Sequence, residues 1–294
     1  MTPALARILD ALQAEAPAAL ARGRVALGRA LGWLGRTTWP EAAWAFSGLA
    51  SGTPVELVWR PGRPGLFWTA EPAPPELSRP LRLRRGLAVL RANGAGLGPG
   101  GERLARQAFR AAAAEWPVLV AGRHDAAGDS GKAYLQAVTL PEGFADLGGA
   151  LLPWDRVMLT GLASTGQREL YWERRCQPGD LWRMRRDPAL AGLALALDQE
   201  LIRWTGRGLD AERKLGLSLS ADGTGRPLAL AAFLHPRQAG GEPALRARLL
   251  AEGGEANPAL ARGWAGGALR PMLLTLGVSA EGARQALGFR LTKA

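Results

Sequence analysis

Lysine and tyrosine are scarce in this chain of 294 residues, so their positions are informative. The sequence holds three lysines and two tyrosines, and both tyrosines and two of the lysines fall in stretches with the alternation of β-strands. In the stretch 132–138, for example, Lys132 and Tyr134 lie opposite small apolar residues. Because successive side chains of a strand point to opposite faces, the polar faces carry Arg60, Lys132, Tyr134, Gln136, Tyr171, Lys214 and Arg290.

Cations that face a common space need an anion. At ~4 Å and an effective dielectric of ~20, each like-charge pair costs on the order of 4 kcal/mol. A diphosphate would relieve this repulsion, and Lys, Arg and Tyr are suitable donors to its oxygens. The sequence therefore predicts a diphosphate site formed by Lys132, Tyr134, Tyr171, Lys214 and Arg290. The alternative is an open sheet whose polar face is hydrated.

Carboxylates on the same strand faces as these cations could bind an acceptor molecule. A buried carboxylate can hold an N–H or O–H group of a substrate and take its proton. Glu56 lies in an otherwise apolar strand and is the predicted catalytic residue, whereas an ion pair with an inward arginine is an equal alternative for Glu169 and Glu173. Aromatic rings could stabilise a carbocation and exclude water. The predicted acceptor and prenyl pocket consists of Trp68, Glu169, Trp172 and Phe233.

Several motifs of metal and nucleotide chemistry do not occur in the sequence. There is no Asp-Asp-x-x-Asp run to hold magnesium on a diphosphate, no P-loop and no His-Glu-x-x-His. Binding a diphosphate through protein cations alone would not require a metal, so we expect magnesium to be possible but not essential. The single cysteine, Cys176, excludes an internal disulfide framework.

Composition restricts the class of protein and its partners. Hydrophobic residues make up 47% and charged residues 21%, which is typical of a globular chain with a sizeable core. No run of 18 apolar residues and no signal-like N-terminus occur, so we expect a cytoplasmic protein with no membrane partner. The net charge of +11 predicts an anionic partner. Nucleic acid is disfavoured because the strands lack the exposed aromatic pattern of single-strand binders; we expect a monomer.

The elements that must position these residues recur five times as helical stretches followed by a hairpin. The predicted hairpins are Pro54–Trp59 with Leu66–Glu71, Val118–Arg123 with Lys132–Val138, Arg156–Leu162 with Arg168–Glu173, Lys214–Leu219 with Leu228–Phe233, and Pro271–Val278 with Leu287–Thr292. The predicted helical stretches are Pro3–Gln13, Pro17–Leu34, Leu77–Ala92, Glu102–Glu115, Phe144–Leu152, Gly179–Arg185, Pro188–Trp204, Pro243–Leu250 and Pro258–Gly263. Ten strands are enough to enclose a cavity. We therefore predict an α+β fold, a ten-stranded antiparallel β-barrel of five ααββ repeats surrounded by an outer ring of helices, as a single domain over residues 1–294.

This organisation resembles the ABBA, or PT-barrel, prenyltransferases. Locally, Lys132–Glu142 resembles a diphosphate-binding strand of cyanobactin-type peptide prenyltransferases, and Glu169–Glu173 resembles a later strand with another diphosphate-contacting tyrosine. Thr53–Glu56 resembles the first-strand segment that bears the acceptor-binding carboxylate. The chain departs from the family in its second and eighth strands, 66–71 and 228–233, which lack the basic residue or tyrosine often found there.

The resemblance implies transfer of an allylic group from a prenyl diphosphate to a nucleophilic side chain of a macrocyclic peptide. The co-substrate would be dimethylallyl, geranyl or farnesyl diphosphate, and no other cofactor would be required. A small aromatic natural product is the alternative acceptor. A non-catalytic basic module that binds an acidic peptide or nucleic acid also stays open, because a fold does not guarantee an activity.

Overall fold

The computed structural model describes residues 3–13, 16–34, 49, 52–111, 118–251 and 258–292, and within them ten strands form one closed barrel. Around the barrel the strands follow the order β1-β10-β9-β8-β7-β6-β5-β4-β3-β2, and each neighbouring pair is antiparallel. The strands are β1 (Val55–Trp59), β2 (Gly65–Ala70), β3 (Val118–Asp125), β4 (Gly128–Gln136), β5 (Arg156–Ala163), β6 (Arg168–Cys176), β7 (Arg213–Ala221), β8 (Pro227–Leu234), β9 (Leu269–Ser279) and β10 (Gly282–Leu291).

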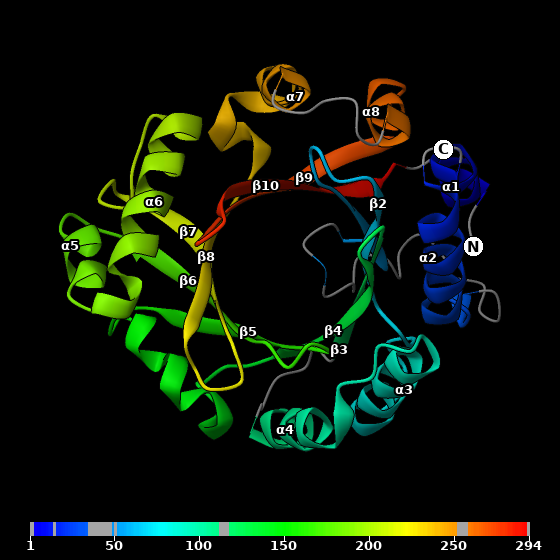
Figure 1. Cartoon of the computed structure of the whole chain (residues 1–294), viewed down its shortest axis with the longest axis horizontal. Coiled ribbons are helices and arrows are strands. Elements are labelled where there is room, and N and C mark those ends of the chain that lie inside the picture. The colour runs from blue at the N-terminus through cyan, green and yellow to red at the C-terminus, as the bar shows by residue number, and fades with distance from the viewer. Residues whose placement is uncertain are drawn as a thin grey trace.

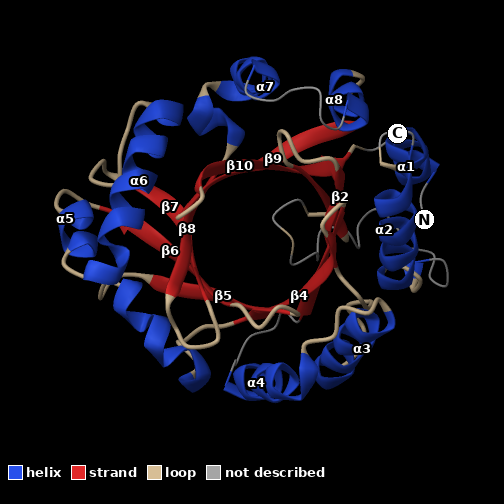
Figure 2. Cartoon of the chain, viewed as in Figure 1, coloured by secondary structure: helices blue, strands red, loops and turns tan. Residues whose placement is uncertain are grey.

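Helices form an outer ring around the strands, as Figures 1 and 2 show. They are α1 (Pro3–Gln13), α2 (Pro17–Ala30), α3 (Arg79–Ala92), α4 (Gly98–Ala111), the 3-10 helix η3 (Glu142–Ala150), α5 (Asp180–Arg185), α6 (Pro188–Thr205), the 3-10 helix η4 (Pro236–Ala239), α7 (Gly241–Ala251) and α8 (Pro258–Ala265). The predicted ring of helices and the ten-stranded antiparallel barrel are confirmed. None of the helices in the described ranges is long and apolar enough to cross a membrane.

The hydrophobic core lies between the barrel and the helices. Alternate residues of each strand are apolar and nearly inaccessible to solvent; Leu57, Trp59, Leu217, Leu219 and Leu274 are examples. The opposite residues point into the barrel and include the polar side chains of Glu56, Lys132 and Tyr134. Burial of the outward faces therefore fixes which side chains line the interior, because a shift of one residue would exchange the two faces.

The two ends of the barrel differ in what connects the strands. At one end, short turns join the strands of each hairpin, and we call this the hairpin end. At the other end, the connections run through the outer helices, and we call this the helix end. The barrel closes where β1 pairs with β10, with Leu57 opposite Phe289 and Trp59 opposite Leu287. Closure therefore joins the first strand of the chain to the last.

Candidate functional site

A buried ionic network connects three strands inside the barrel near its hairpin end. The Lys132 ammonium on β4 forms an ion pair with Glu169 on β6, and the hydroxyl of Tyr171 donates a hydrogen bond to the other oxygen of the same carboxylate. Ser220 on β7 donates to Glu169 Oε1 at 3.0 Å. Lys132 and Glu169 are 4% and 6% exposed, so bulk water screens this pair little.

Two arginines extend this network into a cluster with excess positive charge. Burial alone would raise the pKa of Glu169, but Lys132 and Arg123 outweigh it and lower the pKa to about 2. Burial and the nearby Arg123 and Arg63 lower the pKa of Arg60 to about 9, which leaves it cationic at neutral pH. We define the cation cluster as Arg60, Arg123 and Lys132. Glu169 neutralises only one of these three charges.

Arg60 carries a buried donor that an oxygen of an anionic ligand could satisfy. Its guanidinium lies over the Phe67 ring, with 4.7 Å between Cζ and the ring centroid. Its Nε is buried and has no hydrogen-bond partner among the residues that the structure describes. A buried hydrogen-bond donor without a partner destabilises a protein by about 1–3 kcal/mol. A ligand oxygen that accepts from Arg60 Nε would remove this cost. The cation cluster therefore fits a diphosphate by charge and by donor type.

Three aromatic rings follow the cation cluster along the interior. The rings of Tyr134 and Tyr171 meet edge-on with centroids 5.7 Å apart, and Tyr171 lies 5.6 Å from Phe233 on β8. The Lys132 Nζ lies 5.4 Å from the centroid of the Tyr134 ring. The faces of such rings carry negative potential, which stabilises a nearby cation. We call Tyr134, Tyr171 and Phe233 the aromatic ladder.

Glu56 lies in the interior four residues before Arg60 on the same chain segment. That spacing corresponds to about 13 Å along a strand and places Glu56 toward the helix end. The residue is 8% exposed, and burial raises its pKa to about 7. Within the described ranges, no hydrogen bond or ion pair engages its carboxylate. Gly288 leaves room for it, since a Cβ at that position would lie 2.1 Å from Glu56 Oε1.

The predicted site residues separate into those that the structure brings together and those that it does not. Lys132, Tyr134 and Tyr171 lie together as predicted, and Phe233 joins them. Glu169, which we predicted in the acceptor pocket, instead lies among the cations. Glu56 shares the interior but lies toward the other end. The assignment of these residues to a substrate stays a proposal.

Trp68 and Trp172 are placed wrongly by the sequence interpretation. Both belong to the core between barrel and helices, where Trp68 stacks on His124 with centroids 6.2 Å apart. The reason is the strand period of two: Tyr171 faces the interior, so Trp172 must face the helices. Phe67, the neighbour of Trp68, is the interior aromatic residue on β2 instead.

Lys214 and Arg290 face the interior side but lie at the wrong end. Lys214 is the second residue of β7, has a side chain that is 68% exposed and pairs with Glu173 at 2.7 Å. Arg290 is the penultimate residue of β10, opposite Arg270. Both positions belong to the helix end, whereas Lys132 lies near the hairpin end. The structure therefore does not place these two residues in the predicted diphosphate site.

Arg123 is an interior cation that the sequence interpretation missed. It is the sixth residue of β3 and is paired with Phe67 in the barrel register. Counting by two from Leu119 would have assigned it to the interior. The described residues contain no group of three or more His, Cys, Asp or Glu that could hold a metal ion.

Comparison with known proteins gives a likeness in fold. No family model matches the sequence, and no curated protein matches it. Among solved structures, the 6-dimethylallyltryptophan synthase from Micromonospora olivasterospora in complex with DMASPP and Trp is similar, with a TM-score of 0.69 and 18% identity. The alignment covers 97% of this chain and 95% of that one.

Two further structures show the same likeness. The 5-dimethylallyl tryptophan synthase from Streptomyces coelicolor, also in complex with DMASPP and Trp, aligns with a TM-score of 0.63 at 16% identity over 96% of this chain and 92% of its own. A PriB complex with product diphosphate aligns with a TM-score of 0.67 at 20% identity over 96% of this chain and 93% of its own. The chain thus has the PT-barrel fold of these prenyltransferases.

Proposed function

We propose that this protein is a prenyltransferase that moves an allylic group from a prenyl diphosphate to an aromatic acceptor and requires no metal. The observation that carries the proposal is the cation cluster, with its unsatisfied Arg60 Nε, directly beside the aromatic ladder inside a closed barrel. The fold likeness to structures that contain DMASPP and Trp, or diphosphate, supports it.

The cation cluster would bind the diphosphate and stabilise it as it leaves. The bond between the allylic carbon and the diphosphate oxygen breaks, and the electron pair goes to that oxygen. Lys132, Arg60 and Arg123 compensate the charge that develops there. Donors already in place cost no reorganisation at the moment of reaction, which is the advantage of a rigid barrel.

The aromatic ladder would hold the allyl cation until an acceptor attacks it. Tyr134, Tyr171 and Phe233 would offer ring faces to the cation and keep water away from it. A nucleophilic ring carbon of the acceptor then forms the new carbon–carbon bond. The ring proton at that carbon leaves and restores aromaticity, and the deprotonated carboxylate of Glu56 is the group of the interior suited to hold the acceptor N–H or take the proton.

Two acceptors are compatible with this scheme. The fold likeness favours a small aromatic molecule with an N–H, such as an indole. A peptide side chain is the second candidate, because the interior is lined by small and partly exposed residues along β8 and β9. Ala229, Ala231 and Gly277 all lie there. Small side chains on this side take up little of the interior, which supports the peptide alternative.

Mass spectrometry of reaction mixtures tests the function. The protein is incubated in EDTA with tryptophan or a tryptophan-containing cyclic peptide, and with dimethylallyl, geranyl or farnesyl diphosphate. We expect a prenylated product of at least one donor and acceptor pair, reduced at least tenfold in Arg60→Ala and unchanged in the matched control Lys214→Ala. Product formation only with added magnesium would overturn the metal-free scheme.

The same experiment separates the enzyme from a non-catalytic basic module. Such a module would give no product with any pair, with or without magnesium, and would bind polyanions with an affinity that falls steeply with salt. That combination would overturn the proposed function. Equal activity of Arg60→Ala and the unaltered chain would overturn the assignment of the diphosphate site.

A further inference from the structure

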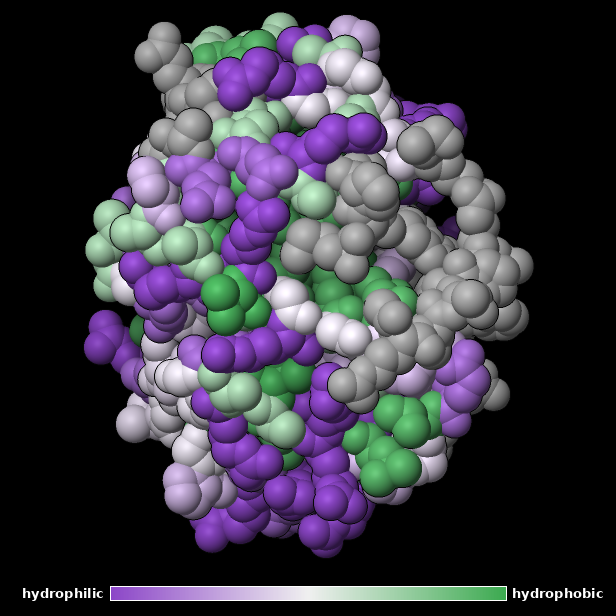
Figure 3. All heavy atoms as spheres, turned by 90° about the vertical axis from the view of Figure 1, so that its right-hand side faces the viewer, coloured by the Kyte–Doolittle hydropathy of each residue, from purple (hydrophilic) through white to green (hydrophobic). Residues whose placement is uncertain are grey.

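A second cationic region lies outside the barrel, on helices α3 and α4. Together these two helices contain eight arginines and one acidic residue, Glu102. Most of the net charge of +11 is therefore concentrated on one helix pair. Figure 3 shows hydrophilic side chains gathered along the lower edge of that view, the level at which α3 and α4 lie in Figure 1.

The outward face of α3 has an unusual pattern for a solvated helix. Leu81, Arg84, Arg85, Ala88 and Arg91 are all exposed and follow helical spacing. A solvated helix normally alternates charges of opposite sign, because like charges at neighbouring positions are destabilising. Among the described residues, no hydrogen bond or ion pair engages Arg84 or Arg85. The face thus presents unneutralised cations around apolar positions.

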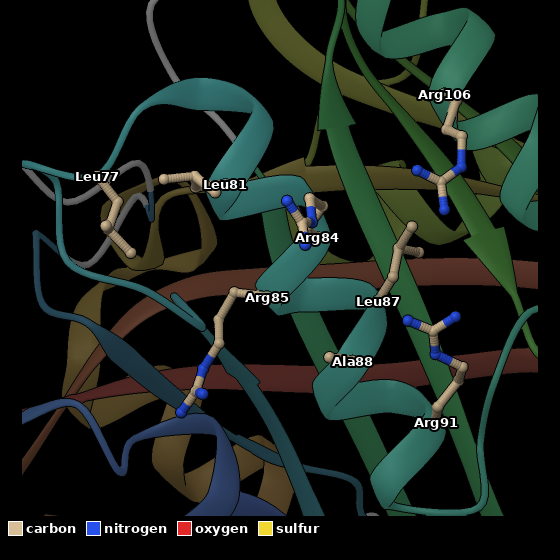
Figure 4. Close-up of a pocket in the computed structure, with 8 residues that line it drawn as sticks. All are labelled: Leu77, Leu81, Arg84, Arg85, Leu87, Ala88, Arg91 and Arg106. Atoms are coloured by element: carbon tan, nitrogen blue, oxygen red, sulfur yellow. The ribbon is translucent and has the colours of Figure 1, made fainter.

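A groove runs along this face. It has a volume of about 410 Å³, and its lining includes Leu77, Leu81 and Leu87 together with Arg84, Arg85 and Arg106. Figure 4 shows these side chains and Arg106 of α4 reaching toward Leu87 of α3. Glu102 bonds Arg91 at 3.1 Å and Arg106 at 3.3 Å. The Glu102 carboxylate therefore already lies between an arginine of α3 and an arginine of α4. A carboxylate of a partner could bind the other arginines of these helices in the same way.

We propose that the α3–α4 groove docks an acidic amphipathic helix of a partner peptide or protein. Leucines on the inserting face would cover Leu77 and Leu81, and flanking glutamates would pair with Arg84, Arg85 and Arg106. The arginine fork favours carboxylates in a bidentate geometry. Nucleic acid fits less well, because the described lining of the groove contains no aromatic side chain on which bases could stack.

Fluorescence anisotropy with a labelled peptide tests this docking site on the full chain. The probe is a helical peptide with leucines at i and i+4 spacing flanked by glutamates, and the control probe has the same composition in scrambled order. We expect the helical probe to bind and Arg84→Glu/Arg85→Glu to weaken it about tenfold or more. Arg185→Glu/Arg186→Glu, an adjacent exposed pair at the C-terminal end of α5 with the same charge change, should bind as the unaltered chain does. Circular dichroism confirms that all variants are folded.

A further variant separates the apolar contribution to peptide binding from the electrostatic contribution. Leu81→Ser keeps every charge and removes the most exposed leucine of the groove, which is 43% exposed. We expect a loss of affinity of about threefold or more, because apolar contact is part of the proposed interface. No binding by the unaltered chain would overturn the proposal. So would equal binding of the scrambled probe, equal loss in both double variants, no effect of Leu81→Ser, or a preference for single-stranded DNA or phosphatidylserine vesicles over the peptide.

Because the groove lies outside the barrel, docking does not depend on the proposed prenyl transfer. A chain without transferase activity could still bind the peptide, and a transferase could fail to bind it. The two experiments therefore fail separately.

Discussion

Glu56 links the stability of the fold to the chemistry proposed for the interior. Burial raises its pKa from an ordinary 4.5 to about 7. The folded chain therefore holds a proton that the unfolded chain has already lost between these pH values, so the free energy of unfolding falls as pH rises from about 4.5 to 7. Each pKa unit corresponds to about 1.4 kcal/mol, which makes this penalty on the order of 3 kcal/mol above pH 7.

The substitution Glu56→Gln should therefore stabilise the protein at pH 8 and leave its stability near pH 4.5 almost unchanged. Thermal unfolding at the two pH values measures this. The same variant should lose prenyl transfer by about 100-fold or more, since a positioned base contributes about 10²–10⁴-fold. Turnover of the unaltered enzyme should rise with pH through about 7, and the variant should lack this limb. A variant with the same pH limb would exclude Glu56 as the group that titrates.

The alternation of side chains along a strand predicted correctly which face most single residues occupy. It was not applied to the tryptophans. Lys132 and Tyr134 face the interior because Ala133 and Leu135, which alternate with them, are apolar and belong to the core between barrel and helices. The same rule, applied consistently, excludes Trp172 from the interior once Tyr171 faces it. Aromatic type alone suggested a pocket residue, but a large apolar ring is stabilised at least as well between sheet and helix.

At the scale of elements, a buried ion pair fastens η3 and the segment after it to the barrel. Arg174 lies on the outward face of β6, where its Nε bonds Asp155 Oδ1 at 2.9 Å and its Nη2 bonds the carbonyl of Ala150 at 3.0 Å. Both side chains of the pair are 0% exposed. Removal of one partner of such a pair leaves an uncompensated buried charge, which costs about 3–5 kcal/mol.

We therefore expect Asp155→Ala to lower the free energy of unfolding by about that amount, measured by urea denaturation. Asp146→Ala is the matched control. It removes the partner of Arg168, but the Asp146 side chain is 41% exposed and water can replace it, so the expected cost is below about 1 kcal/mol. Equal losses in the two variants would contradict the structural role of the Arg174–Asp155 pair.

The extent of the strands was less predictable than their existence. β4 begins at Gly128, four residues before the predicted start at Lys132, because the segment 128–131 pairs with β3 along its backbone. Its glycines and polar residues give no strand pattern of their own. Pairing with a neighbouring strand overrides local preference here, and such pairing is not visible in a single segment of sequence.

At the scale of the whole molecule, five repeated helix-and-hairpin units were enough to predict a ten-stranded barrel. The height of a residue along the barrel axis was not predictable in the same way. Lys132, Lys214 and Arg290 share the interior parity, but alternation gives only the face of a strand, not the end at which a residue lies. The tilt and register of all ten strands set the height, and these depend on pairings as distant as that of Leu57 with Phe289.

The excess charge of the cation cluster should make the whole fold respond to a diphosphate. A ligand that binds only the folded chain stabilises it by about 2.7 kcal/mol at 100 times its Kd, and for a chain of this size that corresponds to a rise in Tm of about 5 °C. Inorganic pyrophosphate in EDTA is the probe, and differential scanning fluorimetry is the measurement.

Arg60→Ala should lose most of the shift in Tm, because the unsatisfied Nε and one of the charges are gone. Lys214→Ala should keep it, because that lysine lies at the helix end and pairs with Glu173. An equal loss in both variants would mean that pyrophosphate binds through the overall charge of the protein, and a shift that needs magnesium would mean that protein cations alone do not hold it.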